Sequence, residues 1–339
     1  MASTTGRVIR AEQKFSWKRV LLKWEVFLVV IFIAVNVMNA CISPYYLSVN
    51  GLFSATSSFL DKAFIVLPMA YVLLLGEIDI SVGATVALSA CVLGITYNAG
   101  MPMSVAILVC LLTGSLCGAV NGIILTKFTE LAPMIVTLGT QILFRGIAVI
   151  LLTDQATGGF NQVPWFKSLY WGKVGVVPIM FIVFIFCAIV FGIIMHCTTF
   201  GRRMYAIGKN PEAAGYSGIP VQKIRFIVYT ITGTFSAVTA VFLASGMGSV
   251  RSNIASGYEL EAISMAVLGG ILTDGGKGNF PGAILAVFIL GFLRYGLGLV
   301  NVPSQLMMVI IGLLLILVVM APNLKPARRS GQNKGKTKR

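Results

Sequence analysis

The sequence predicts an all-α integral membrane protein with about ten transmembrane helices, and with both the N-terminus and the C-terminus in the cytoplasm. Its 339 residues are 57% hydrophobic and only 11% charged, and the mean hydropathy is +0.90. A soluble globular protein carries about 25% charged residues, so much of this chain must lie in the lipid bilayer. The length fits one membrane domain, because no polar stretch is long enough to form a separate soluble domain.

Ten apolar stretches approach the roughly 20 residues that a helix needs to cross a bilayer. They lie at about 24–42, 63–80, 81–98, 102–126, 134–153, 176–198, 224–247, 258–273, 280–300 and 303–321. The second and third stretches share a seam at Gly76–Gly83, and the eighth is short and rich in glycine. These ranges are the predicted helices.

The basic residues orient the predicted helices. With the N-terminus inside, the cytoplasmic segments collect 20 of the 26 Lys and Arg residues, as expected from the retention of basic loops on the cytoplasmic side. The other six are Lys62, Lys167, Lys173 and Arg251 outside, and Arg145 and Arg294 within spans. Because both tails are basic, the number of crossings must be even.

The predicted organisation has three parts. Residues 1–23 and 323–339 are basic cytoplasmic tails, and residues 24–322 are the transmembrane domain, with a long cytoplasmic loop at 199–223. Basic tails beside a membrane bind anionic lipid headgroups or stay solvated more often than they bind nucleic acid. We therefore expect membrane lipid as a partner and no nucleic acid.

Side chains for catalysis, metal binding or nucleotide binding are scarce. The six cysteines contain no C-x-x-C pair and are expected to be small buried residues, and His196 is the only histidine. Gly275-Gly276-Lys277 lacks the P-loop glycine, since position 271 is Ile, and Gly278 follows the lysine where Ser or Thr is needed. We expect no cofactor, no metal, no catalytic residues and no ATP hydrolysis by this chain alone.

The cytoplasmic loop predicts a short helix that begins near Asn210 or Pro211 and stops at Gly215 or Gly218. Asn is a good N-cap, Pro is favoured in the first turn, and Gly ends helices. Such a helix, projecting between basic residues, is suited to docking another protein, although an ordinary connection between two spans remains the alternative.

Small residues in the fourth span, Gly114, Gly118 and Gly122, recur every fourth position. This spacing lets helix backbones approach closely in lipid, so helix packing is the expected role. Lining a pathway for a polar solute, together with Asn121, is the second interpretation.

Charged residues in the spans are candidates for a pathway or a gate. Arg145 and Arg294 either face a cavity or an ion-pair partner, or extend to the membrane surface. Glu77 and Asp79 lie at the seam between two helices, where a carboxylate either caps the next helix or contacts the transported solute.

Several segments together resemble the permeases of ribose-, xylose- and arabinose-type ABC importers, between about residue 60 and residue 322. The cytoplasmic loop carries Thr199, Gly201, Arg202, Ala206, Ile207, Gly208, Asn210, Ala213, Ala214, Ser217, Gly218 and Ile219. Further matches are Gly76–Gly83, Val136–Thr140 with Arg145-Gly146, Gly269-Gly270, Gly275–Gly278 and Gly282. Glu77 departs from this family, in which many members carry glycine. The segment from Lys23 to Gly83 is most similar to rhamnose-type and autoinducer-type permeases.

The resemblance implies an inner-membrane permease subunit that imports a neutral monosaccharide or a related polyol-like solute. Its partners would be a dimer of ATPase subunits, a second permease chain and an extracytoplasmic sugar-binding protein. The coupling loop would bind in a groove of the ATPase subunit, and Gly208→Trp or Ala214→Arg is expected to uncouple a protein that is still inserted in the membrane.

The alternative is an ion-coupled secondary transporter. Such proteins usually carry acids at mid-membrane, whereas the acids of this chain lie near the ends of spans. An integral membrane enzyme has no supporting motif.

Overall fold

The computed structural model describes residues 24–153 and 155–320, so the predicted basic tails at 1–23 and 323–339 lie outside the described residues. The helices are α2 (Trp24–Ile42), α3 (Val49–Ser57), α4 (Leu60–Leu74), α5 (Val82–Asn98), α6 (Met103–Lys127), α7 (Pro133–Leu152), α8 (Pro164–Trp171), α9 (Ile179–Cys197), α10 (Thr199–Lys209), α11 (Pro211–Tyr216), α12 (Val221–Met247), α13 (Tyr258–Leu268), α14 (Phe280–Leu299) and α15 (Ser304–Met320). Short elements are β1 (Thr157–Gly158), the 3-10 helix η1 (Phe160–Gln162), β2 (Lys173–Val174), β3 (Val177–Pro178) and β4 (Ser249–Val250).

The predicted all-α class is confirmed, because each of the ten predicted stretches contains a helix. By length and apolar composition, six described helices could cross a membrane, namely α2, α6, α7, α9, α12 and α14. The pair α3 and α4, bent by 61°, would make a seventh. Because α5 and α15 have 17 residues each and α13 has 11, ten crossings remain a prediction.

The seam between the second and third predicted stretches is a real break in the helix. The predicted stretch 63–80 is replaced by α4, which begins at Leu60 and ends at Leu74. Gly76 takes a left-handed backbone conformation with φ of 80°, and the Glu77 amide donates back to the Val72 carbonyl at 3.2 Å. This geometry is typical of a helix C-terminus, and it leaves residues 75–81 as a turn before α5.

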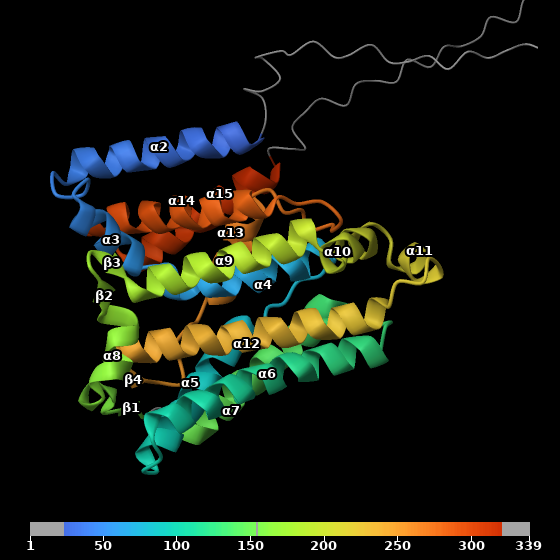
Figure 1. Cartoon of the computed structure of the whole chain (residues 1–339), viewed down its shortest axis with the longest axis horizontal. Helices are drawn as coiled ribbons and strands as arrows, with labels where there is room; N and C mark the ends of the chain where they lie inside the picture. The colour runs from blue at the N-terminus through green and yellow to red at the C-terminus, as the bar shows by residue number, and fades with distance from the viewer. Residues whose placement is uncertain (1–23, 154, 321–339) are drawn as a thin grey trace, which may run out of the picture.

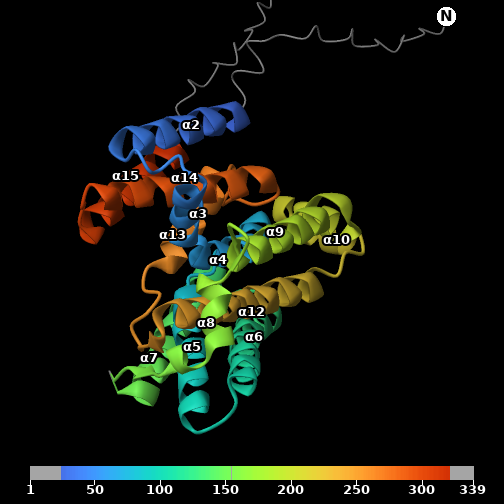
Figure 2. The ribbon, with the colours of Figure 1, turned by 60° about the vertical axis from the view of Figure 1, so that its left-hand side comes forward.

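Helix α4 forms the core of the molecule. Each of its side chains except Lys62 is buried, and α9, α12 and α13 pack around it. Figure 2 shows α4 at the centre, between the α5, α6 and α12 group and the α2, α14 and α15 group. A helix that is apolar all round must be enclosed by protein or lipid, and here other helices of the same chain enclose it.

Helices α6 and α12 pack through glycine, as the four-residue spacing predicts. A β-carbon on Gly114 would lie 2.4 Å from the Gly233 carbonyl oxygen, and one on Gly118 would lie 2.3 Å from the Tyr229 carbonyl oxygen. Any larger residue would push the two backbones apart. Helix packing, the first interpretation of these glycines, is therefore confirmed.

The two ends of the bundle differ in construction. At one end, α8 lies with two small antiparallel sheets, in which β1 pairs with β4 and β2 with β3. At the other end, α10 lies beside the ends of the long helices and α11 projects beyond them (Figure 1). The two sheets are too short to alter the all-α class.

The six cysteines are all free, but the prediction that they are buried is only partly right. Cys91, Cys110 and Cys117 are buried and Cys187 is half-buried, whereas Cys41 and Cys197 are exposed. The two exposed residues stand at or next to the last residue of α2 and α9, where the neighbouring helices no longer cover the side chain.

Candidate coupling site and translocation pathway

The predicted short helix in the 199–223 loop is α11. The Asn210 side chain accepts a hydrogen bond from the Ala213 amide at 2.9 Å, and Pro211 occupies the first helical position. The helix ends at Tyr216, and Gly218 follows with a left-handed φ of 79°. Both the predicted start and the glycine-assisted end are therefore confirmed.

A second helix, α10, precedes α11 and is not among the predicted helices. The Thr198 side chain caps it by accepting from the Gly201 amide at 3.3 Å, and Met204 and Ile207 are buried on one face. A threonine N-cap followed by apolar residues three positions apart is a helix signal. That signal could have found α10.

The ten predicted coupling residues divide by exposure. Arg202, Asn210, Ala213, Ser217 and Gly218 are exposed, Ala206, Gly208 and Ile219 are half-buried, and Gly201 and Ala214 are buried. Tyr216, which the sequence does not single out, is 94% exposed. A partner could therefore reach one face of α11 and the outer side of α10, while the remaining residues hold these helices on the bundle.

Four glycines and one carbonyl form what we call the glycine junction: Gly76, Gly208, Gly275 and Gly276 with the Leu74 carbonyl. The Gly276 amide donates to that carbonyl at 2.8 Å. A β-carbon on Gly208 would lie 1.9 Å from the Leu74 oxygen, and one on Gly275 would lie 2.6 Å from the Gly76 nitrogen. Three motifs that are far apart in the sequence thus meet backbone to backbone at the end of α4.

Tyr205 makes a further link from α10 to the loop between α13 and α14. Its hydroxyl donates to the Gly278 carbonyl at 2.8 Å. Burial raises the pKa of the Tyr205 phenol above its ordinary value, because a buried phenolate would lose its hydration. The hydroxyl therefore stays a donor, and α10 is held by a side chain as well as by its backbone.

The two acids at the seam have different partners. Glu77 accepts from the Arg225 guanidinium of α12 at 2.5 Å, and the same guanidinium donates to the Leu125 carbonyl at the end of α6 at 2.9 Å. It is Asp79 that accepts from the Ser81 amide, at 2.9 Å, just before α5. Glu77 therefore forms an ion pair with α12, and it is Asp79 that accepts from the amide before α5. The solute contact of Glu77 stays a prediction.

Asn121 joins the same region through Ser81. Its amide donates to the Ser81 hydroxyl at 2.8 Å, and that hydroxyl donates to Asp79 at 2.7 Å. Three of the five candidate pathway residues, Glu77, Asp79 and Asn121, therefore gather at the turn between α4 and α5.

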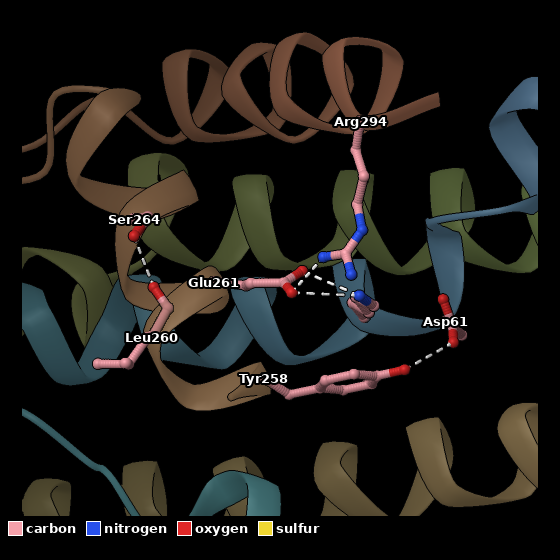
Figure 3. Close-up of polar contacts among 7 residues, drawn as sticks. Asp61, Tyr258, Leu260, Glu261, Ser264 and Arg294 are labelled. Carbon is pink, nitrogen blue, oxygen red and sulfur yellow. Dashed lines mark hydrogen bonds and ion pairs between the residues drawn. The ribbon is translucent and has the colours of Figure 1, made fainter. Parts of the chain in front are cut away.

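Arg294 lies at the other end of α4, in what we call the ionic cluster of Asp61, Lys62, Tyr258, Glu261 and Arg294. Figure 3 labels Asp61, Tyr258, Glu261 and Arg294 of this cluster. Glu261 pairs with both Arg294 and Lys62, the latter at 3.0 Å. The Tyr258 hydroxyl donates to Asp61 at 3.4 Å, and the Lys62 ammonium lies 4.5 Å from the Tyr258 ring centre. Of the interpretations left open for Arg294, the structure shows the ion pair.

Sequence reasoning did not single out the partners of Arg294 as functional residues. Lys62 is expected outside, and Glu261 near the end of a span. The opposite charges of Arg294 and Glu261 were the signal that could have suggested this pair, because ionisable residues within spans usually pair with one another.

Arg145 is not part of the ionic cluster. Its guanidinium donates to the Ser252 and Ile254 carbonyls at 2.8 and 2.7 Å. One helical turn away on α7, Gln141 donates to Glu259 at 3.1 Å. Arg145 and Arg294 therefore bind different segments, and Arg145 holds the chain that leads from β4 into α13.

Comparison with known proteins shows the family of this chain. The family described as "Branched-chain amino acid transport system / permease component" matches residues 51–319. The autoinducer 2 import system permease protein LsrD of Salmonella paratyphi B is 36% identical over 308 residues, covering 89% of this chain and 92% of the relative. The protein of the same name from Escherichia coli strain SMS-3-5 is 37% identical over 306 residues, with the same coverage. No solved structure matches the chain.

The match spans the turn at residues 75–81, the α10–α11 loop and the loop between α13 and α14, so it includes every segment of the glycine junction. The importer resemblance seen in the sequence is confirmed, as are the inner-membrane location and the assignment of ATP hydrolysis and solute capture to separate partner subunits. The chain therefore belongs to this family of permease components, and it is the non-catalytic membrane subunit of an ABC importer.

Proposed function

We propose that this permease imports autoinducer 2 or a neutral, hydroxylated solute of similar size. The observation that carries the proposal is the 36–37% identity to autoinducer 2 import permeases over 89% of the chain. The family description names branched-chain amino acids instead.

If the solute passes the ionic cluster, the ion pairs there suit a neutral solute better than a charged one. An amino acid carries a carboxylate, which a buried site would have to pair with a cation. In the cluster, the cations Lys62 and Arg294 already pair with Glu261. A hydroxylated neutral solute needs only hydrogen bonds and leaves these ion pairs intact.

We further propose that α10 and α11 bind the ATPase subunit. In support, α11 projects beyond the long helices (Figure 1), and a β-carbon added at Gly215 or Gly218 would meet open space. Exposed Tyr216 at its end provides the kind of aromatic anchor that is enriched in protein interfaces. The end of the bundle that carries α10 and α11 is then the cytoplasmic end, and α8 with its two sheets lies outside.

This orientation fits ten crossings with both termini inside. The bent pair α3 and α4 would form one crossing, and the short helices α5, α13 and α15 would complete the ten predicted stretches. Two permease chains, two ATPase subunits and an extracytoplasmic binding protein would form the transporter. ATP binding would close the ATPase pair and reorient the helices around a central path.

The test is uptake into proteoliposomes that contain the permease with its ATPase subunits, with the binding protein added outside. We expect ATP-dependent uptake of autoinducer 2, and no uptake of leucine under the same conditions. Uptake of leucine but not of autoinducer 2 would contradict the proposed solute. A parallel sample without ATPase subunits should show no uptake.

A further inference from the structure

The Arg225 guanidinium holds three segments together near the end of the bundle that carries α10 and α11. It pairs with Glu77 in the turn after α4 and donates to the Leu125 carbonyl at the end of α6. The two side chains of the pair are only 15% and 8% exposed. Removing one partner of such a pair leaves an uncompensated buried charge, so the pair strongly favours one relative position of α12 and the turn.

The turn after α4 is also contacted by the segment that precedes α11 in the chain. Before α11, the end of α10 contacts the Leu74 carbonyl through Gly208. After α11, which ends at Tyr216, α12 begins at Val221 and carries Arg225 in its second turn. The last turn of α10 and the start of α12, which lie before and after α11 in the chain, therefore both attach to residues 74–77.

Residues 74–77 continue directly from α4, which connects the two ends of the bundle. The helix has 15 residues, which is about 22 Å at 1.5 Å per residue. Its first turn carries Asp61 and Lys62 of the ionic cluster, which contact Tyr258 and Glu261 of α13. Glu261 in turn pairs with Arg294 of α14. A displacement of residues 74–77 would therefore be carried along a buried, close-packed helix to that cluster.

We propose that the Glu77–Arg225 ion pair is a positioning contact that passes movement of the docking helices to α4. It is needed to couple ATP hydrolysis to the rearrangement of the helices, but not to bind the ATPase subunit. The proposal rests on the proposed function of α10 and α11 as the ATPase-binding element. It gives a role to Glu77, the residue at which this chain departs from the importer-permease pattern that its sequence resembles.

The experiment uses the full transporter, purified with its ATPase subunits, and the variants Glu77→Gln, Arg225→Gln and the swap that combines Glu77→Arg with Arg225→Glu. Glu130→Gln is the matched control, because Glu130 is an exposed acid in the loop after α6. The movement is followed as the distance between spin labels at Leu260 and Val174, which are 59% and 64% exposed. The exposed residues Cys41 and Cys197 are first replaced by Ser.

We expect the parent and Glu130→Gln to change the label distance when ATP is added. Glu77→Gln and Arg225→Gln should lose that change while they retain bound ATPase subunit and hydrolyse ATP within about twofold of the parent, because charge removal leaves the exposed docking face unaltered. The charge swap should recover at least part of the change.

A retained distance change in Glu77→Gln would overturn the proposal, and so would a parent protein without any change. Loss of the ATPase subunit from both single variants would show a merely structural pair, and the same conclusion follows if the swap recovers nothing. The labels report movement without a transported solute. Failure of the parent to take up autoinducer 2 would therefore contradict only the proposed solute.

Discussion

The Leu74 carbonyl oxygen lies 1.9 Å from the place where Gly208 would carry a β-carbon. The last turn of α10 therefore rests directly on the last turn of the buried helix α4. No side chain can enter this contact without moving one of the two backbones. This explains why a glycine is needed at a position that the family resemblance alone assigns to the coupling loop.

Gly208→Ala is expected to destabilise the permease itself. The added methyl group overpacks a backbone contact, and overpacking of this kind costs about 1–3 kcal/mol. Thermal unfolding of the purified protein in detergent should show a lower Tm. The matched control is Gly215→Ala, which adds the same methyl group on α11 in open space and should leave the Tm unchanged or slightly raised. Equal Tm values for the two variants would contradict the close contact.

Tyr216→Asp is the cleaner probe of ATPase docking. Gly208→Trp and Ala214→Arg, which the sequence suggests, alter half-buried and buried positions and would disturb the fold as well as the partner. Tyr216 is 94% exposed, so its loss should lower the recovery of the ATPase subunit by about tenfold, or 1.4 kcal/mol, with an unchanged Tm. The control is Tyr45→Asp, an 82% exposed tyrosine after α2. Normal co-purification of Tyr216→Asp would rule out docking through this end of α11.

Glu261→Gln should be the most damaging change in the ionic cluster. It leaves both Lys62 and Arg294 without their shared partner, and an unpaired buried charge costs about 3–5 kcal/mol. Arg294→Gln should cost less, because Lys62 still pairs with Glu261. Thermal unfolding compares the two variants, with Leu260→Met on the exposed side of α13 as the control. A similar loss of Tm in both variants would mean that Lys62 does not hold Glu261 by itself.

Single-cysteine variants can test the proposed orientation. Cys41 at the end of α2 and Cys197 at the end of α9 are both exposed. With α10 and α11 in the cytoplasm, a membrane-impermeant maleimide should label Cys41 in intact cells and Cys197 only after permeabilisation. Cys110, which is buried, should resist labelling in both cases and serves as the control. Labelling of Cys197 from outside would reverse the orientation.

Local features of the fold could be predicted from the sequence because their causes are local. Apolar stretches long enough to cross a bilayer, the Asn210 cap of α11 and the glycine spacing on α6 each depend on residues within a few turns of one another. Helix ends were harder to place, as α4 shows. Its apolar stretch runs on past Leu74, and only the left-handed Gly76 ends the helix.

Long-range partners could not be predicted in the same way. Glu77 and Arg225 are 148 positions apart, and Lys62 and Glu261 are 199 apart. A charged residue within a span signals that a partner exists, but it does not identify the partner. For Glu77 this left a helix cap and a solute contact as the only interpretations, whereas the structure pairs it with α12.

The sequence by itself determined that this chain lies in a membrane and that one of its loops resembles the coupling loop of importer permeases. Hydropathy, charge and short motifs depend on the sequence alone, so they can be recognised without knowing any tertiary contact. Only the tertiary structure decided that the Gly76, Gly208 and Gly275 segments meet at the end of α4, with a buried ion pair on one side of that helix end and the ionic cluster at the other end of the helix. The reason is physical: a backbone contact between glycines and an ion pair between distant helices exist only after the helices have packed.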